Sequence, residues 1–346
     1  MSVEFIDFLG GTMKKIFSIF ICMALLLTVG FGMISCDFFP EKGADQNDKE
    51  HTDQIDQNAK DYADALAFLD TGKYVEAKAL FEKLGDYKDS EEYLSKFYYM
   101  PISFEYDLIG KKSTNYVEYN SQNLPASEAT VREDVNAVAE FVYDESGTIL
   151  KQIMTNHTTG TVVSYSYTYD SNGKRIGAVY SDQSGPVASH VFEHDSNGNL
   201  VKETYTGADG LVYVYASTYD ENGNIISQEG SYDGMTYYSL DVSYATDANG
   251  RVIREVCTYS DGSQESLDYA YDEMGNRIKS VYTDFEGLQT CYEYTYDSNG
   301  NVINEVCTDP DGVVQYVKTE YVLLYIPTGI TEGTRLFFID FWSTRL

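Results

Sequence analysis

The strongest constraint on this chain is a short motif that recurs seven times at a nearly constant spacing. The motif reads Y-D-x-x-G-x-(apolar), and its clearest copy is Tyr296-Asp297-Ser298-Asn299-Gly300-Asn301-Val302. A fixed period of about 25 residues indicates a repeat architecture, in which each unit is stabilised mainly by its neighbours. The motif aspartates are Asp144, Asp170, Asp195, Asp220, Asp247, Asp272 and Asp297.

Each copy predicts a β-hairpin. Tyr292, Tyr294 and Tyr296 occupy every second position, so they share one face of a strand. Asp297 and Gly300 favour a tight turn, because aspartate caps the turn backbone and glycine tolerates a positive φ. Seven copies predict about 14 strands of a long twisted antiparallel sheet. The predicted fold class is therefore mainly β, a repeat β-hairpin ribbon with a small N-terminal α-helical segment.

Residues 137–326, which hold the seven repeats, resemble the RHS or YD repeats of bacterial surface and secreted proteins. At the tyrosine position two copies depart from the motif, with His194 and Thr246 in place of tyrosine. In large family members such repeats coil into a shell around a C-terminal toxin. Here about 14 strands look too few to close a shell. We therefore expect a coiled ribbon, one end of which the N-terminal helices could cap while the apolar tail within 327–346 could cover the other.

The first 36 residues have the features of a secretory signal, with Met13 as a candidate start. Lys14 and Lys15 precede an apolar run, and Met33-Ile34-Ser35-Cys36 resembles a bacterial lipobox. That resemblance implies a lipidated Cys36 and an extracytoplasmic protein anchored to the bacterial membrane. The alternative is an uncleaved transmembrane anchor, since about 20 apolar residues can span a bilayer.

Three segments separate the signal from the repeats. Residues 37–57 are polar and acidic, which predicts a flexible tether. Residues 58–98 have helical periodicity and resemble one tetratricopeptide unit, which would either cap the first strands or dock a partner. Residues 99–136 predict two strands followed by a loop.

The net charge narrows the possible partners, and the cysteines raise the question of a disulfide. The net charge of −31 argues against nucleic acid, whose phosphates require a basic surface. Cys291 and Cys307 would lie directly opposite each other if the register of a bulged hairpin holds, with Asp297 paired to Asn301. In an oxidising compartment these two cysteines could form a disulfide, or they could remain free thiols.

The chain shows no pattern typical of a catalytic, cofactor or metal site. Turns such as 195–199 are acidic but lack the ligand spacing of a calcium loop, so a plain turn is expected. His190 and His194 would be about 13 Å apart on one strand, too far to share a zinc ion. No serine–histidine–acid or cysteine–histidine set stands out. We therefore expect no enzyme activity and no cofactor.

The tyrosine face is the candidate interaction surface. It either holds the sheet together by cross-strand packing or forms a platform for a glycan or a protein. One functional hypothesis is a non-enzymatic surface lipoprotein whose ribbon is a spacer or interaction surface. The alternative is an accessory subunit that docks a partner through its helical segment. The face comprises Tyr165, Tyr167, Tyr169, Tyr215, Tyr219, Tyr269, Tyr271, Tyr292, Tyr294 and Tyr296.

Overall fold

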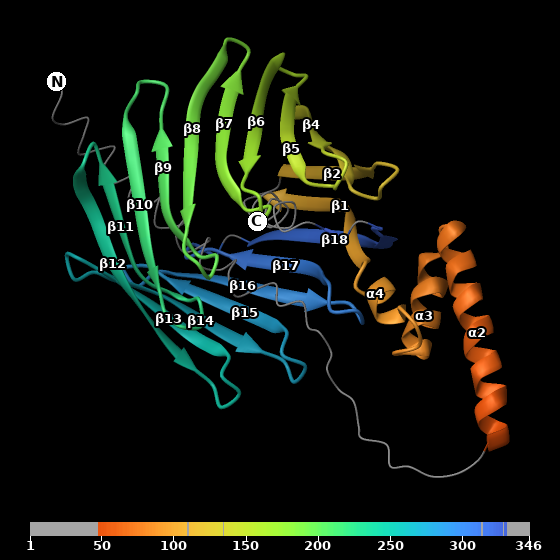
Figure 1. Ribbon diagram of the computed structural model, residues 1–346. Helices are drawn as coiled ribbons and strands as arrows, with labels where there is room; N and C mark the ends of the chain where they lie inside the picture. The colour runs from red at the N-terminus through yellow and green to blue at the C-terminus, as the bar shows by residue number, and fades with distance from the viewer. Residues whose placement is uncertain (1–47, 109–110, 134, 313, 328, 331–346) are drawn as a thin grey trace.

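The computed structural model describes residues 48–108, 111–133, 135–312, 314–327 and 329–330. Three helices precede a run of antiparallel strands (Figure 1). The helices are α2 (Asp48–Asp70), α3 (Tyr74–Leu84) and α4 (Ser90–Leu94). The strands are β1 (Phe97–Leu108), β2 (Lys111–Tyr119), β3 (Pro125–Arg132), β4 (Val135–Tyr143), β5 (Ile149–Asn156), β6 (Thr161–Tyr169), β7 (Arg175–Asp182), β8 (Gly185–His194), β9 (Leu200–Thr206), β10 (Val212–Tyr219), β11 (Ile225–Tyr232), β12 (Met235–Thr246), β13 (Val252–Tyr259), β14 (Gln264–Tyr271), β15 (Arg277–Thr283), β16 (Gln289–Tyr296), β17 (Val302–Thr308) and β18 (Val314–Tyr325).

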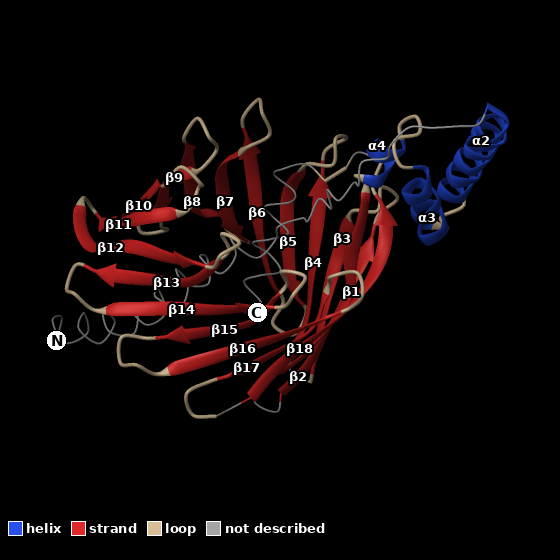
Figure 2. Ribbon diagram, turned by 90° about the horizontal axis from the view of Figure 1, so that it is seen from below, coloured by secondary structure: helices blue, strands red, loops and turns tan. Residues whose placement is uncertain are grey.

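The strands form one closed 18-stranded antiparallel β-barrel. Figures 1 and 2 show how the sheet curves round on itself. Each strand pairs with its sequence neighbours, and β1 pairs with both β2 and β18. The prediction of an open twisted ribbon was therefore wrong, because the sheet closes into a barrel. The two end strands satisfy each other's backbone groups, so neither edge needs a helix or the tail to cover it. The tail from residue 331 onward lies outside the described residues.

The seven predicted hairpins account for strands β4 to β17, and four further strands complete the barrel. The expected loop at the end of 99–136 instead contains β3, which pairs with β2 along its length. The turn between them is an eighth, degenerate copy of the motif, Tyr119-Asn120-Ser121-Gln122-Asn123-Leu124-Pro125. Asn123 takes the place of glycine there and adopts a φ of 60°. Asparagine is one of the few residues that tolerate this conformation.

A β-bulge follows every motif turn. In the seventh copy Tyr296 faces Val302, whereas Thr295 faces Asn304, so Ile303 has no partner on β16. The extra residue turns the side chains that follow it to the opposite face. The bulged residues of six copies are exposed aliphatic side chains, namely Leu150, Ile176, Ile226, Ile253, Ile278 and Ile303.

The buried face of the sheet is the inner face of the barrel. On β14, Glu265, Leu267 and Tyr269 are buried, while the residues between them are more exposed. Apolar clusters along this inner face include Leu240 with Cys257, and Phe141 with Ile149. The alternation of strand side chains thus places the tyrosine positions inside the barrel.

The helices pack beside the ends of β1 and β18. Phe81 stacks on Tyr93 with ring centroids 4.7 Å apart, and Tyr325 lies 6.0 Å from Tyr93 and 5.2 Å from Phe97. These aromatic contacts join the helical module, α2 to α4, to the barrel. Figures 1 and 2 show the module at one end of the barrel. No helix within the described ranges is both long and apolar enough to cross a membrane.

Helix α2 begins at Asp48, ten residues before the expected start at 58. Part of the expected tether at 37–57 is therefore helical. No glycine or proline interrupts this stretch, and acidic residues near a helix N-terminus interact favourably with the helix dipole. The signal, Cys36 and the first part of the tether lie outside the described residues.

Candidate functional site

The structure places the candidate tyrosine face on the inside of the barrel. Tyr269 is buried, with 7% of its surface exposed, and the other nine tyrosines are half-buried. Burial raises the pKa of Tyr294 to about 12. The face is therefore a lining of the barrel and not an outer platform.

Where a copy of the motif opens with tyrosine, that residue ties its hairpin to the preceding one. The hydroxyl of Tyr271 donates a 2.8 Å hydrogen bond to the backbone carbonyl oxygen of Val252, the apolar residue of the preceding copy. The fifth copy has Thr246 at the motif position, and Tyr244 makes the equivalent bond to Ile225 instead. This repeated contact supports the cross-strand packing role. The remaining bonds join Tyr119 to Pro101, Tyr143 to Pro125, Tyr169 to Ile149, Tyr219 to Leu200, Tyr296 to Arg277 and Tyr321 to Val302.

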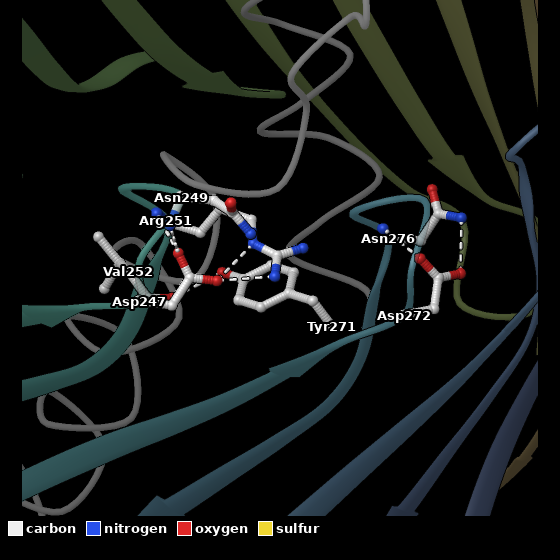
Figure 3. A network of polar contacts seen from close by, with 7 residues as sticks. All are labelled: Asp247, Asn249, Arg251, Val252, Tyr271, Asp272 and Asn276. Carbon is white, nitrogen blue, oxygen red and sulfur yellow. Dashed lines mark hydrogen bonds and ion pairs between the residues drawn. The ribbon is translucent and has the colours of Figure 1, made fainter.

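The motif aspartate organises the turn backbone. Asp247 Oδ1 accepts hydrogen bonds from the backbone N–H groups of Asn249 and Arg251, at 2.8 and 3.0 Å (Figure 3). Its Oδ2 binds the Arg251 guanidinium, which also lies 4.8 Å from the ring centroid of Tyr271. Both oxygens of the Asp247 carboxylate are thus hydrogen-bonded to residues of its own turn. Within the part of the chain that the structure describes, no group of three or more potential ligand side chains could hold a metal ion.

A charged cluster lies on the inner face between β13 and β17. The Arg277 guanidinium sits 5.6 Å from the ring centroid of Tyr269 and 5.2 Å from that of Tyr294. Tyr269 donates a 2.8 Å hydrogen bond to Glu255, which is 1% exposed. Burial raises the pKa values of Glu255 and Glu305 to about 7, and the charge of Arg277 partly opposes both shifts. These two carboxyl groups gain and lose protons near neutral pH.

His190 and His194 lie on the inner face of β8. His190 Nδ1 lies 2.6 Å from Glu203 Oε1, and its ring centroid is 4.9 Å from that of Tyr205. His190 therefore has a carboxylate and an aromatic neighbour, as expected for a residue that replaces tyrosine in the ladder. His194 occupies the motif position of the third copy.

The predicted pairing of Cys291 with Cys307 was wrong. Because of the bulge at Ile303, Cys291 faces Thr308 and Cys307 faces Tyr292. The two cysteines thus lie on opposite faces of the sheet, and both are free thiols.

A cavity of about 300 Å³ lies between the helical module and the barrel. Asn123, at the turn of the eighth motif copy, donates hydrogen bonds of 2.9 Å to the Tyr74 hydroxyl and 2.8 Å to the Tyr325 carbonyl oxygen. Sequence reasoning missed this site, although the spacing of Tyr119, Asn120 and Asn123 matches the motif. The cavity is lined by Leu66, Leu69, Asp70, Tyr74, Tyr93, Ser121, Asn123, Tyr325 and Pro327.

No family model and no curated protein matches the sequence. Among solved structures, a porin-like protein from Bacteroides uniformis is 12% identical over 65% of this chain and 96% of its own, with a TM-score of 0.38. A second, from Bacteroides vulgatus, is 10% identical over 64% of this chain and 98% of its own, with a TM-score of 0.26. The Photorhabdus luminescens Tc holotoxin pore is 10% identical over 57% of this chain but only 14% of its own, with a TM-score of 0.31. Likeness at this level identifies neither a family nor a function.

Proposed function

We propose that this chain is a non-enzymatic, lipid-anchored extracytoplasmic protein whose barrel is a rigid spacer that holds an interaction surface for a protein or glycan. The observation that carries the proposal is the repeated bond from a motif tyrosine to the preceding hairpin, such as Tyr271 to Val252. The tyrosine hydroxyl is the polar group that recurs most regularly in the repeats, and its bond to the preceding hairpin stiffens the barrel. The repeats are thereby suited to support, which favours an interaction surface outside the bonded tyrosines.

The helical module and its junction with the barrel are the favoured interaction surface. Val75 on α3 is 67% exposed, and the cavity opens between α2 and the end of β18. A concave site with apolar and aromatic walls and a few polar groups is the usual form of a binding site. This arrangement supports the hypothesis that a partner docks through the helical segment.

The outer face of the strands supports attachment through a lipid on Cys36. Arg254 pairs with Asp268 at 3.1 Å, and Lys202 pairs with Glu193 at 2.7 Å, both on the outside of the sheet. Strands that face lipid carry an outward apolar band, whereas charged pairs suit contact with water. A lipidated residue would hold such a barrel at the membrane surface.

Two experiments test the proposal. Metabolic labelling with an alkyne fatty acid should mark the wild-type protein and not the Cys36→Ser variant, which should leave the membrane fraction. Purified ectodomain should bind cell wall, a glycan array or a purified partner in a way that Val75→Glu weakens and Tyr294→Phe leaves unchanged. An unlabelled wild type contradicts the anchor. Binding that survives Val75→Glu contradicts the helical surface.

The inner face is a second candidate because some of its aromatic rings take no part in the tyrosine bonds. Tyr205, Tyr213 and Tyr232 form a row with successive centroid distances of 6.0 and 4.8 Å, and each is half-buried. Such a row could stack against sugar rings. Glycan binding that is lost in Tyr213→Ala and retained in Val75→Glu would favour this face over the helical module.

A further inference from the structure

The cavity at the junction of the helical module and the barrel has the features of a ligand site. Its volume of about 300 Å³ lies at the lower end of the range for small-molecule pockets. Its walls come from α2, α3, α4, the β2–β3 turn and the end of β18. Segments far apart in the sequence must therefore be assembled before the site exists.

The aromatic wall of the cavity is fixed in place. Tyr93 and Tyr325 lie with ring centroids 6.0 Å apart and ring planes 26° apart. Phe81 supports Tyr93 from behind with a parallel ring at 4.7 Å. Tyr74 is held by the hydrogen bond from Asn123 Nδ2. Tyrosine faces carry negative potential, so they attract cations.

The polar side of the cavity is anionic. Asp70 is the last residue of α2, exposed at the rim of the cavity, where the helix dipole adds negative potential. Among the described residues, Asp70 has no hydrogen-bond or ion-pair partner. The amide nitrogen of Asn123 already donates to Tyr74 and Tyr325, which leaves its carbonyl oxygen to face a donor. The nearby Lys96 is paired with Glu92 at 2.8 Å, and its ammonium nitrogen also lies 6.0 Å from the ring centroid of Tyr93, so this ring of the wall already has one cation beside it.

We propose that this cavity binds a small organic ammonium group between its tyrosine wall and Asp70. The inference rests on the proposed function, since it names a ligand class for the junction of the helical module with the barrel. An ammonium group matches both features of the site, because the rings attract its charge and the carboxylate neutralises it. The net charge of −31 further concentrates cations near the protein.

Choline titrated into the ectodomain and followed by saturation-transfer NMR tests the inference. Its neutral carbon isostere, 3,3-dimethylbutan-1-ol, should bind at least about fivefold more weakly. Asp70→Asn should weaken choline binding by a similar factor, and Tyr74→Leu should also weaken it. Asp64→Asn is the matched control, because Asp64 is exposed on the same helix and does not line the cavity.

Three outcomes would overturn the inference. Equal binding of choline and its isostere would show that charge plays no part. If Asp70→Asn and Asp64→Asn bound choline with equal affinity, choline would bind elsewhere. N-acetylglucosamine is titrated in the same way, and a signal from it with none from choline would make the cavity a sugar site. Thermal midpoints of all variants show whether the fold is kept. Failure here leaves the Cys36 labelling result untouched, so the two proposals fail separately.

Discussion

The hydroxyl of Tyr296 donates a 2.6 Å hydrogen bond to the backbone carbonyl oxygen of Arg277, which holds the last position of the preceding motif copy, where most copies have an apolar residue. Tyr296→Phe keeps the ring and removes this bond. We expect it to lower the free energy of unfolding by about 1 kcal/mol, the usual net value of one hydrogen bond. Urea unfolding followed by circular dichroism measures the change.

Tyr116→Phe is the control for that experiment, because Tyr116 is 53% exposed and makes no such bond. Its free energy of unfolding should match that of the wild type. If Tyr296→Phe and Tyr116→Phe were equally stable, the tyrosine bonds would not contribute to the stiffness of the barrel, and the spacer proposal would lose its main support.

Glu255 and Glu305 should make the barrel less stable as the pH rises. Both have pKa values of about 7 in the folded protein, against an ordinary value of 4.5. Between these values the folded state holds more protons than the unfolded state, so stability falls as the pH increases through this window. Each group can cost roughly 3 kcal/mol above pH 7.

Glu255→Gln should therefore raise the thermal midpoint at pH 8 and have little effect at pH 5. Glutamine keeps an oxygen that can accept the bond from Tyr269. Glu273→Gln, in an exposed turn, should leave the pH profile unchanged. A wild-type midpoint that rises between pH 5 and pH 8, with no effect of Glu255→Gln, would contradict the assignment.

Asn123 should control how firmly the helical module is held. Asn123→Gly restores the usual motif residue and relieves a positive φ, but it removes the bonds to Tyr74 and Tyr325. Two lost hydrogen bonds outweigh the relief, so we expect a net loss of about 1 kcal/mol. Faster amide exchange confined to α2, α3 and α4 would be the signature. Unchanged exchange there would show that aromatic contacts alone fix the module.

Cys291 and Cys307 should both react with a thiol reagent in the unfolded, non-reduced protein. They lie on opposite faces, so no disulfide can join them without moving the backbone. Intact mass after alkylation without reductant measures the number of free thiols. A mass deficit that reductant restores, mapped to these two residues, would contradict the register around Ile303.

The same bulge shows where prediction from sequence reached its limit. The period, the Asp297–Gly300 turn and the hairpin around it could be predicted, because each depends on a few adjacent residues. The bulge at Ile303 could not be predicted, since the backbone of Ile303 has the same chemistry as that of any strand residue. One skipped position moved Cys307 to the other face and was enough to make the disulfide prediction wrong.

Neither the closure of the barrel nor the presence of the cavity could be predicted from the sequence, for a different reason. Closure depends on the summed twist of all the strands and on β1, β3 and β18, which carry no full motif. The cavity combines residues of α2, the β2–β3 turn and the end of β18, more than 200 residues apart. Asn120 and Asn123 were the one available signal, an asparagine version of the motif.

Closure itself can be tested by a disulfide across the seam. Ser103 on β1 faces Glu320 on β18, and the Ser103 hydroxyl lies 3.2 Å from a carboxylate oxygen of Glu320. Directly opposed residues of antiparallel strands have the Cα separation that a disulfide needs. Ser103→Cys with Glu320→Cys should oxidise fully and raise the thermal midpoint, because the bond closes a long loop of the unfolded chain.

The control pair is Ser103→Cys with Lys318→Cys, which shares the outer face but is shifted by two residues along β18. It should crosslink slowly, since its Cα atoms are farther apart. Both pairs are made with Cys291 and Cys307 replaced by serine, which leaves the buried Cys257 as the other thiol within the described residues. In an open ribbon β1 and β18 would lie at opposite ends, and neither pair would crosslink within one molecule. Rapid intramolecular oxidation of the first pair alone would therefore establish both the closure and the register of the seam.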